Sequence, residues 1–371
     1  MNFELTQEQQ LIKRTASQIA EEEFADDAFT WESEFPTANM VTLAENDLLG
    51  IALPQEYGGG GFTPLEVILA QEAVGRICPD TAHILSRSSM GPPRVIAELG
   101  SDYLKEKYLP QVTGGECIMS VAISEPQAGS DAGAMETTGS IEGDEVVLDG
   151  QKAWITKGTY ADAFLVYARF EESIGAVVVD ADADGLTVGD GYENMAGGVQ
   201  TDLYLDDCRV PKEQILAIGE DSFKQLLKEF NVERCHNAMM CVACGLNAFD
   251  KALSHAAERN QFDQPLSDFQ GIEWKLARMA TELESARLLI YRAAESDSPS
   301  RLETSIAKIK ANEVGQEVVD EALQIHGAMG YTKGNPLEYM YRLVRGWKIA
   351  GGTIEIQLNG VATELKKYGL E

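Results

Sequence analysis

The stretch KIAGGTIEIQ, residues 348–357, places two glycines side by side in a chain that otherwise reads as helix on both sides. Gly351 and Gly352 have no side chain, so neither can take or give a proton. They leave bare backbone that another molecule can approach closely. The stretch therefore raises the question of which acidic side chain, elsewhere in the chain, would carry a reaction at this loop.

Two further stretches contain residue types that suit a flat, polar ligand. ISEPQAGSDAG, residues 123–133, gathers small residues and hydroxyls, so its backbone N–H groups can approach an anion or a ring system. In LDGQKAWITKG, residues 148–158, Trp154 and Thr156 lie two apart on an expected strand and share one face. An indole beside a hydroxyl can flank a ring and hydrogen-bond its heteroatom. Taken alone, an ordinary surface turn explains the first stretch equally well, and a core tryptophan with a strand threonine explains the second better.

Three regions of different pattern must position these residues, and together they predict an α+β fold. Residues 1–117 are expected to be mostly helical, with a capping box from Thr6 and Gln9 and a short helix ended by Pro110 and the Gly114–Gly115 pair. Residues 118–220 contain β-branched runs separated by turns, which indicates a small antiparallel β domain. Residues 221–371 predict a bundle of four helices, the last over about Ile354–Lys367.

Charge excludes several classes of partner. Sixty acidic and thirty basic residues give a net charge of −30, and such a surface repels nucleic acid and anionic membranes. The acids are spread along the chain, which favours a solvated, halophilic surface over a disordered acidic tail. No apolar run approaches the ~20 residues of a membrane span, and the N-terminus has no apolar signal region. We therefore expect a soluble, cytoplasmic protein.

The cysteines predict neither a disulfide framework nor a metal site. Six cysteines have irregular spacing in a chain much longer than a small secreted scaffold, so free thiols are expected. Cys241 and Cys244 form a C-x-x-C pair with His236 nearby, but the segment reads as continuous helix and no second pair follows. A structural zinc site needs four ligands, so no metal is expected.

Together the motifs make the chain resemble the acyl-CoA dehydrogenase family over nearly its whole length. The resemblance runs from LTQEQQ through LPQEYGGGG, SEPQAGSD, GQKAWITKG, ERNQFDQPLSDFQ and QIHGAMGY to GGTIEIQ. It implies a helical N-terminal domain, a middle β domain and a C-terminal four-helix bundle, with FAD bound between the last two. It also implies α,β-dehydrogenation of an acyl-CoA thioester, as in fatty-acid β-oxidation, with electrons passed to an electron-transferring flavoprotein.

The resemblance also implies which residues hold FAD. The flavin half would be contacted by Val121, Ile123, Ser124, Gly129, Ser130, Trp154, Ile155, Thr156, Thr353 and Glu355, and Ser130 would also touch substrate. Members of this family are usually homotetramers in which a neighbouring subunit helps to hold the adenosine half. That role would fall to Arg259, Gln261, Phe262, Gln270, Gln324 and Gly327. An arginine beside a pyrophosphate is physically reasonable in so acidic a protein.

The base is implied by a pair of features. In many family members a glutamate stands directly before the GT of the glycine loop, where this chain has Gly351. Isovaleryl- and long-chain-type members are similar in placing it on the first long helix of the bundle, followed by arginine, as Glu233 and Arg234 are in FNVERCH. The N–H of Gly351 would then hold the thioester carbonyl, together with a ribityl hydroxyl of FAD. Asn231, Arg234 and Gly352 would contact substrate. The alternative for Glu233 is an acidic residue on the helix surface with no role in the reaction.

Several departures leave alternatives open. Gln127 replaces a glycine common in the family, MAGGVQTDLYL is shorter and lacks an arginine, and His326 and Ala350 stand where aromatics are frequent. The acyl pocket is therefore expected to differ in shape. One alternative is a reductase acting on an enoyl-CoA, similar to crotonobetainyl-CoA reductase-like members, because one site serves both directions. Another is a non-catalytic scaffold that binds flavin or acyl-CoA.

Overall fold

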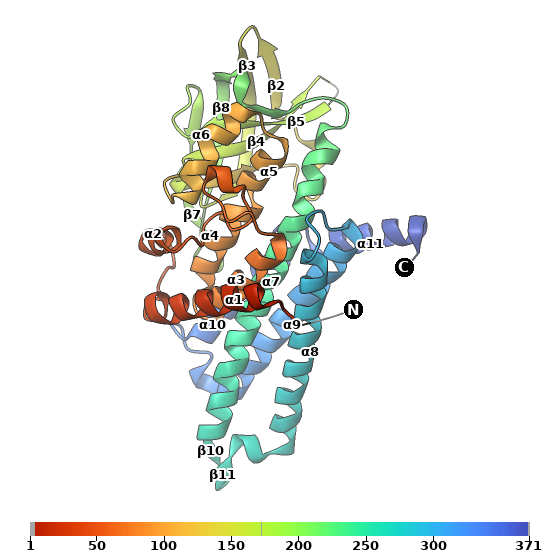
Figure 1. The fold of residues 1–371 in the computed structure, drawn as a ribbon. Helices are drawn as coiled ribbons and strands as arrows, with labels where there is room; N and C mark the ends of the chain where they lie inside the picture. Colours follow the sequence, from red (N-terminus) through yellow and green to blue (C-terminus); the bar gives the residue numbers. More distant parts are fainter. Residues whose placement is uncertain (1–3, 172, 370–371) are drawn as a thin grey trace. The chain divides into compact units, whose positions relative to one another are not determined.

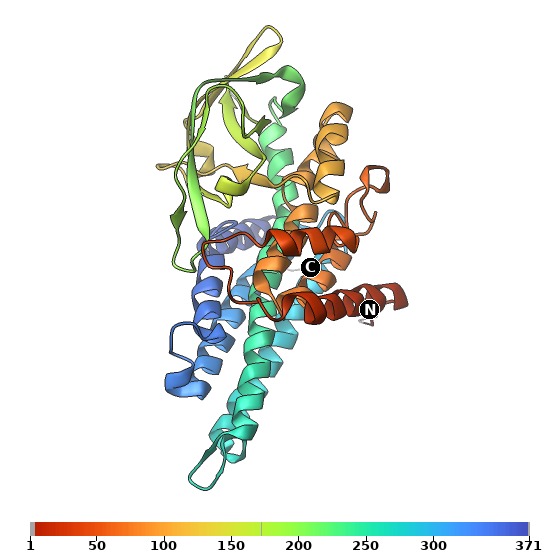
Figure 2. The same ribbon diagram turned by 90° about the vertical axis from the view of Figure 1, so that its left-hand side faces the viewer.

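The computed structural model describes residues 4–171 and 173–369, and its elements run helix, strand and helix again in chain order (Figures 1 and 2). The expected α+β class and the order of its three regions are therefore confirmed. The first region contains α1 (Gln7–Ile19), α2 (Thr37–Glu45), α3 (Pro64–Gly75), α4 (Pro79–Met90), α5 (Pro92–Leu99) and α6 (Asp102–Thr113).

Local signals account for where these helices begin and end. The capping box of α1 is confirmed, since Gln9 N donates to Thr6 Oγ1 at 3.2 Å and Thr6 N donates to Gln9 Oε1 at 3.0 Å. The expected end of α6 at the Gly114–Gly115 pair is confirmed, since Gly114 is its C-cap, whereas Pro110 lies inside the helix and does not end it. A proline in the last turns removes one N–H, while Gly114 N still donates to Pro110 O at 3.0 Å.

The middle region forms one nine-stranded sheet. Its main path runs β6-β8-β3-β2-β4-β5-β9, with β1 beside β4 and β7 beside β8. The strands are β1 (Met119–Ala122), β2 (Thr138–Glu142), β3 (Glu145–Thr156), β4 (Ala163–Phe170), β5 (Ser173–Asp180), β6 (Leu186–Val188), β7 (Tyr192–Glu193), β8 (Val199–Pro211) and β9 (Ile215–Ala217). Most strand pairs are antiparallel as expected, but β1 and β2 each pair with β4 in parallel.

Strand alternation gives this sheet two apolar faces. On β4, Phe164 and Val166 pack with residues of β3, β5 and β8, whereas Leu165 and Tyr167 pack on the opposite face. That second face is covered by buried side chains of α5 and α6, such as Ile96. A sheet buried on both faces is a rigid platform for the loops at its edges.

The described part of the last region, residues 221–369, contains five α-helices. They are α7 (Ser222–Glu258), α8 (Gln270–Ala294), α9 (Arg301–His326), α10 (Pro336–Trp347) and α11 (Ile354–Tyr368), and a small hairpin of β10 (Asn260–Gln261) and β11 (Gln264–Pro265) precedes α8. The four expected helices are present, and α10 is additional. Its start carries an ordinary signal, since Asn335 Oδ1 accepts from Leu337 N at 2.9 Å and Pro336 is the first helical residue.

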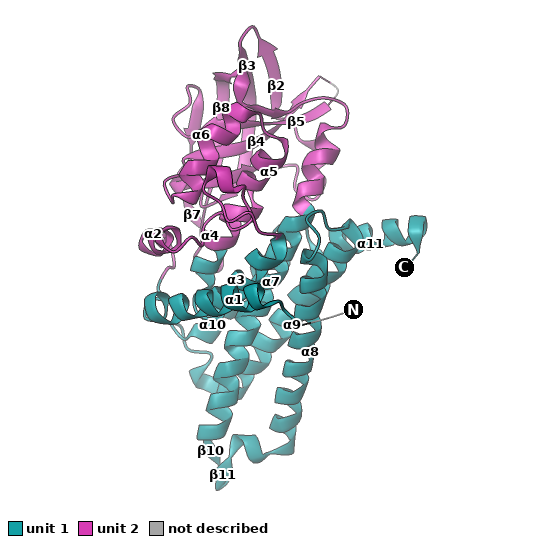
Figure 3. Ribbon diagram, viewed as in Figure 1, with its two compact units in different colours: residues 1–30, 64–83, 231–371 teal, residues 31–63, 84–230 magenta. Residues whose placement is uncertain are grey.

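The chain divides into two compact units, each of which is assembled from stretches that are not continuous in the sequence (Figure 3). Unit 1 contains residues 1–30, 64–83 and 231–371, and unit 2 contains residues 31–63 and 84–230. In unit 1, α3 is buried on all sides and contacts α1 and α8. Unit 2 contains the sheet with α5 and α6. The boundaries 1–117, 118–220 and 221–371 expected from the sequence stay a prediction.

None of the helices in the described part of the chain has both the length and the apolar character needed to cross a lipid bilayer.

Candidate active site

The glycine loop between α10 and α11 has a backbone that only glycine suits. Gly351 and Gly352 have φ values of +64° and +88°, in the left-handed region that disfavours residues with a Cβ. A Cβ built on Gly351 would lie 2.4 Å from Asn237 Nδ2, which is too close for any side chain. A glutamate at position 351 would therefore be strained and would clash, so the acid for this loop must come from elsewhere.

Buried side chains bind the carbonyl groups of this loop. Lys308 on α9 donates from Nζ to Ala350 O at 2.5 Å and to Gly352 O at 2.7 Å. Gln357 on α11 donates from Nε2 to Gly351 O at 3.4 Å and to Gly352 O at 3.1 Å. Lys308 and Gln357 are buried, so three consecutive carbonyls are held from the interior of the helical unit.

The N–H groups of the same peptides are not used within the described chain. None of the described residues accepts a hydrogen bond from the N–H of Gly351 or Gly352. Gly351 is exposed, so its N–H can donate to an incoming group. This is the arrangement that a site for a developing oxyanion requires, because its donors are fixed before the ligand arrives.

Glu233 on α7 belongs to the same neighbourhood of the helical unit. Asn237, which lies against Gly351, is one helical turn after Glu233 and donates from Nδ2 to Glu233 O at 3.1 Å. Burial lowers the pKa of Lys308 to about 7, and the charge of the Glu233 carboxylate favours the protonated lysine. Glu233 is half-buried at this position of α7.

Arg234 points along its own helix. Its Nη1 donates to Asn231 Oδ1, and Asn231 Nδ2 in turn donates to Pro299 O at 3.2 Å. Burial and, to a smaller extent, the nearby charge of Arg301 lower the pKa of Arg234 to about 10, while Glu233 favours the charged form. The described bonds thus join Arg234 to Asn231 and place both beside the expected base.

Glu355 lies in the first turn of α11 and is a weak candidate base. Hydrogen bonds from its own backbone N–H and from the Thr353 hydroxyl lower its pKa, so it holds a proton poorly. Thr353 is the N-cap, with its Oγ1 accepting from Ile356 N at 3.3 Å. Both residues therefore lie at the start of α11, and the lowered pKa makes Glu355 a poor base.

In the sheet unit, Trp154 occupies a β-bulge with strained backbone. Its φ is +58°, and the register between β3 and β8 shifts between Lys152 and Ile155. Its N–H donates to Tyr192 Oη at 3.1 Å and to Asp202 Oδ1 at 3.3 Å. A bulky residue with positive φ persists only where its surroundings impose it, and such residues cluster at functional sites.

The structure separates the alternatives for this strand. Trp154 is 48% exposed, so it is not a core tryptophan. Trp154 and Thr156 are both exposed and flank the buried Ile155, which agrees with the shared face expected from the sequence. The side chain of Ile155 lies in the sheet core, so only its backbone can face a ligand.

A buried ion pair anchors the loop 123–133. Lys152 Nζ donates to Glu125 Oε1 at 2.7 Å, and the two side chains are 0% and 1% exposed. Glu125 also accepts from Glu136 N at 2.6 Å and from Thr137 N at 3.0 Å. Beyond this anchor, Gly129 and Ser130 are exposed, and a Cβ on Gly129 would meet nothing within 4 Å.

The remaining flavin candidates of the sheet unit lie at the end of β1 and directly after it. Val121, Ile123 and Ser124 are half-buried, and Ser124 O accepts from Ala153 N at 2.9 Å. This bond ties the end of β1 to the strand that carries Trp154. The candidates from residues 121–130 and 154–156 are thus brought together in one unit.

The residues expected to hold the adenosine half lie in the helical unit. His255 on α7 and His326 on α9 stack with centroids 4.3 Å apart, which joins the ends of these helices near Arg259 and Gly327. Phe262 is 88% exposed at the hairpin turn. The expected set is exposed, as a site completed by another subunit requires, and consists of Arg259, Gln261, Phe262, Gln270, Gln324 and Gly327.

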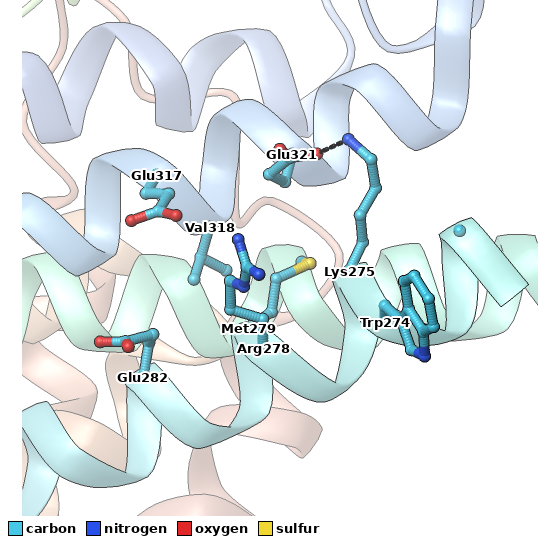
Figure 4. A pocket seen from close by; sticks show the side chains of 9 residues that line it. Trp274, Lys275, Arg278, Met279, Glu282, Glu317, Val318 and Glu321 are labelled. Atoms are coloured by element: carbon cyan, nitrogen blue, oxygen red, sulfur yellow. Dashed lines mark hydrogen bonds and ion pairs between the residues drawn. The ribbon is translucent and has the colours of Figure 1, made fainter.

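A pocket of about 210 Å³ lies between α8 and α9, and its lining residue Gly271 directly follows the candidate Gln270 in the chain (Figure 4). Lys275 and Glu321 form an ion pair across it, and Trp274 stands at its edge with 64% of its surface exposed. No residue expected in the active site lines it. Among the described residues no group of three His, Cys, Asp or Glu side chains could hold a metal ion.

Asn237, Lys308 and Gln357 were missed by sequence reasoning. The spacing of Glu233 and Asn237 by four residues was a usable signal, because it predicts one helix face. No sequence signal marks Lys308 or Gln357, because each binds backbone carbonyls, which every residue has. The carbonyls that Lys308 binds are also distant from it in the sequence.

Comparison with known proteins followed these observations. Family profiles described as acyl-CoA dehydrogenase N-terminal, middle and C-terminal domains match residues 6–116, 120–208 and 221–366. A Bacillus subtilis protein named "Probable acyl-CoA dehydrogenase YngJ" is 35% identical over 99% of this chain and 100% of its own length. An "Acryloyl-CoA reductase (NADH)" of Anaerotignum propionicum is 35% identical over 99% and 96% of the two chains.

A solved structure agrees with the sequence relatives. The butyryl-CoA dehydrogenase of Megasphaera elsdenii superposes with a TM-score of 0.94 and 28% identity, covering 99% of this chain and 100% of that one. The similarity therefore extends over all three regions of the fold.

Proposed function

The chain belongs to the acyl-CoA dehydrogenase family, and from that premise we propose that Glu233 is the base of an α,β-dehydrogenation of a short acyl-CoA thioester. The enzyme is an FAD-dependent oxidoreductase. One observation carries the assignment of the base: Gly351, where many relatives have the glutamate, has positive φ and lies against Asn237. The adjacent acid on α7 is Glu233, one turn before Asn237.

The residues of the glycine loop and of the facing part of α7 then each have a role that their geometry permits. Gly351 N–H donates to the thioester carbonyl and stabilises the charge that develops on its oxygen as the α-proton leaves. Glu233 takes that proton, and exclusion of water around bound substrate raises the pKa of such a carboxylate, which suits a general base. Arg234 and Asn231, joined by a hydrogen bond, orient Glu233 and the CoA chain, and Gly352 leaves room for the substrate.

The residues of the sheet unit fit a flavin. Trp154 is exposed and held in place by Tyr192 and Asp202, and Thr156 is exposed on the same side of β3. Bound FAD supplies the acceptor for the hydride. The small and hydroxyl residues Ser124, Gly129 and Ser130 would contact it from the loop after β1, and Val121 and Ile123 would pack beside it.

The substrate class rests on relatives. Enzymes named for butyryl-CoA and acryloyl-CoA act on short acyl groups, and both cover nearly the whole chain. We favour the oxidative direction with an electron-transferring flavoprotein as acceptor. The acryloyl-CoA reductase relative keeps reduction of a short enoyl-CoA as the second candidate.

Assembly as a homotetramer is part of the proposal. Phe262 and Arg259 are exposed at one end of the helical unit, where a second copy would cover the aromatic ring and bring Arg259 to the FAD pyrophosphate. We further propose that the enzyme works in a salt-rich cytoplasm, because its net charge of −30 suits such a solvent. Its role there would be short-chain fatty-acid oxidation.

The test is anaerobic mixing of the FAD-loaded protein with a panel of saturated acyl-CoAs. Rapid bleaching of the flavin absorption by butyryl-CoA, abolished in Glu233→Gln and retained in Glu258→Gln, supports both substrate and base. Glu258 is a suitable control because it is an exposed acid at the far end of the same helix. Oxidation of the reduced enzyme by enoyl-CoA alone would favour the reductase, and ligand binding without turnover would favour the scaffold.

A further inference from the structure

Lys308 is a buried cation with two backbone partners. Its side chain is fully buried in α9, and Nζ donates to Ala350 O at 2.5 Å and to Gly352 O at 2.7 Å. Neither partner is a carboxylate, so the lysine is not placed there to form an ion pair. Burying an ammonium group with no carboxylate bonded to it is costly, which indicates that its hydrogen bonds to the loop matter.

The first of these bonds acts on the peptide that carries the proposed donor. A peptide unit is planar and trans, so the C=O of Ala350 and the N–H of Gly351 belong to one rigid group and point in opposite directions. A hydrogen bond to that oxygen from α9 therefore directs the Gly351 N–H away from α9. This agrees with the absence of an acceptor for that N–H among the described residues.

The bond also changes the strength of that donor. Hydrogen bonds from a charged donor are stronger than neutral ones, and bonds through a shared peptide polarise one another. An ammonium group on the Ala350 oxygen draws electron density from the amide and makes the Gly351 N–H a better donor. The effect grows as negative charge develops on the group that accepts from Gly351.

We propose that Lys308 is a positioning residue of the active site, which orients and polarises the Ala350–Gly351 peptide so that the Gly351 N–H binds the thioester carbonyl as a strengthened donor. This inference rests on the proposed function and deepens it. Substrate meets Gly351, and Lys308 acts through the peptide from the opposite side.

The other anchor on α9 offers a matched control. Asn312 lies one helical turn beyond Lys308 and donates from Nδ2 to Trp347 O at 2.6 Å. It is fully buried and holds the start of the same segment, but it does not touch the Ala350–Gly351 peptide. Asn312→Leu removes a buried anchor of similar size, so loosening of the segment alone should affect both variants.

The experiment compares wild type, Lys308→Met and Asn312→Leu as FAD-loaded proteins. Crotonyl-CoA labelled with carbon-13 at the thioester carbonyl is bound to the oxidised enzyme, and the carbonyl stretch is read by isotope-edited infrared spectroscopy. We expect the stretch to lie well below that of free ligand in wild type and Asn312→Leu, and to return toward the free value in Lys308→Met. The kcat for butyryl-CoA should fall by about 10- to 100-fold in Lys308→Met, with KM little changed.

The outcomes separate this inference from the function on which it rests. A wild-type enzyme that turns over butyryl-CoA, with the same carbonyl stretch in Lys308→Met, overturns the role of Lys308 alone. Equal losses in Lys308→Met and Asn312→Leu also overturn it, because loosening would then suffice. A wild-type protein that shifts no carbonyl and turns over no thioester overturns the proposed function itself. If Lys308→Met does not fold, Lys308→Gln takes its place, because glutamine keeps a neutral donor at this position. A carbonyl stretch in Lys308→Gln equal to that in wild type would decide against polarisation by charge.

Discussion

Asn237 Nδ2 lies 2.4 Å from the position that a Cβ atom on Gly351 would occupy. The two residues come from α7 and from the loop before α11, so a helix side chain dictates what the loop can contain. The same asparagine bonds the backbone of Glu233. Asn237 thus excludes a side chain at position 351 and lies one helical turn after the proposed base.

The first prediction concerns this contact. Gly351→Ala should destabilise the protein, because positive φ costs a residue with a Cβ roughly 1–2 kcal/mol and the clash with Asn237 adds to it. Turnover should fall, since the N–H of residue 351 moves. Urea unfolding and flavin bleaching measure the two effects, and Asn237→Ala should recover part of the lost stability in the double variant.

Gly346→Ala is the control for this prediction. Gly346 lies in α10, and a Cβ there would meet nothing within 4 Å, so alanine should be neutral or stabilising by up to ~1 kcal/mol. A Gly351→Ala protein as stable and active as Gly346→Ala would show that the contact does not constrain the loop.

The second prediction concerns the buried pair of Glu125 and Lys152. Removing one partner leaves a buried charge uncompensated, so Glu125→Gln should cost ~3–5 kcal/mol of unfolding free energy and should weaken FAD binding through the loop 123–133. Breaking the exposed pair of Arg292 and Glu303 with Arg292→Gln should cost at most ~1 kcal/mol. Chemical unfolding at neutral pH compares the two, and equal losses would contradict the prediction.

The third prediction is the pH dependence that this pair imposes. Burial favours the neutral acid, but hydrogen bonds from the Glu136 N–H, from Lys152 and from Thr137 outweigh it and lower the pKa of Glu125 from 4.5 to about 2. Because the folded state holds the proton less tightly than the unfolded one, the contribution is complete above pH 4.5 and is lost as pH falls toward 2. Unfolding free energy measured across this range should drop less steeply in Glu125→Gln, and parallel curves for the two proteins would refute the assignment.

The fourth prediction concerns Trp154. Its indole is exposed and its backbone strained, so Trp154→Gly should relieve strain while weakening FAD binding by up to about tenfold, the worth of an aromatic contact. Tyr204→Ala removes an equally exposed aromatic from β8 of the same sheet and should leave FAD affinity unchanged. Flavin fluorescence titration measures both, and equal affinities in the two variants would remove Trp154 from the flavin site.

Sequence reasoning succeeded where structure depends on near neighbours. The capping box of Thr6 and Gln9 and the exposed pair of Trp154 and Thr156 follow from spacing within one element. The parallel pairing of β1 with β4 could not be predicted in this way, because parallel strands are joined by long connections that carry no turn signal. The helix α10 was not predicted, although Asn335 and Pro336 mark its start.

The candidate site divides in the same way. Glu233 and Gly351 could be named from motifs. The hydrogen bonds of Lys308 to the loop could not, because they join residues 42 and 44 positions apart. Lysine in a helix usually indicates solvent exposure, and only the packed structure places this one in the interior.

The last prediction concerns salt. At a net charge of −30, carboxylates repel one another in the folded state, and dissolved ions screen that repulsion, so Tm should rise from low salt to molar KCl. Glu21, Glu22 and Glu23 form an exposed run after α1, and replacing all three by glutamine brings the net charge from −30 to −27. This variant should gain Tm at low salt and little at high salt, because screening has already removed the repulsion there. Differential scanning calorimetry at both salt concentrations decides, and a gain of equal size at both would mean that these acids act locally and not through the charge of the surface.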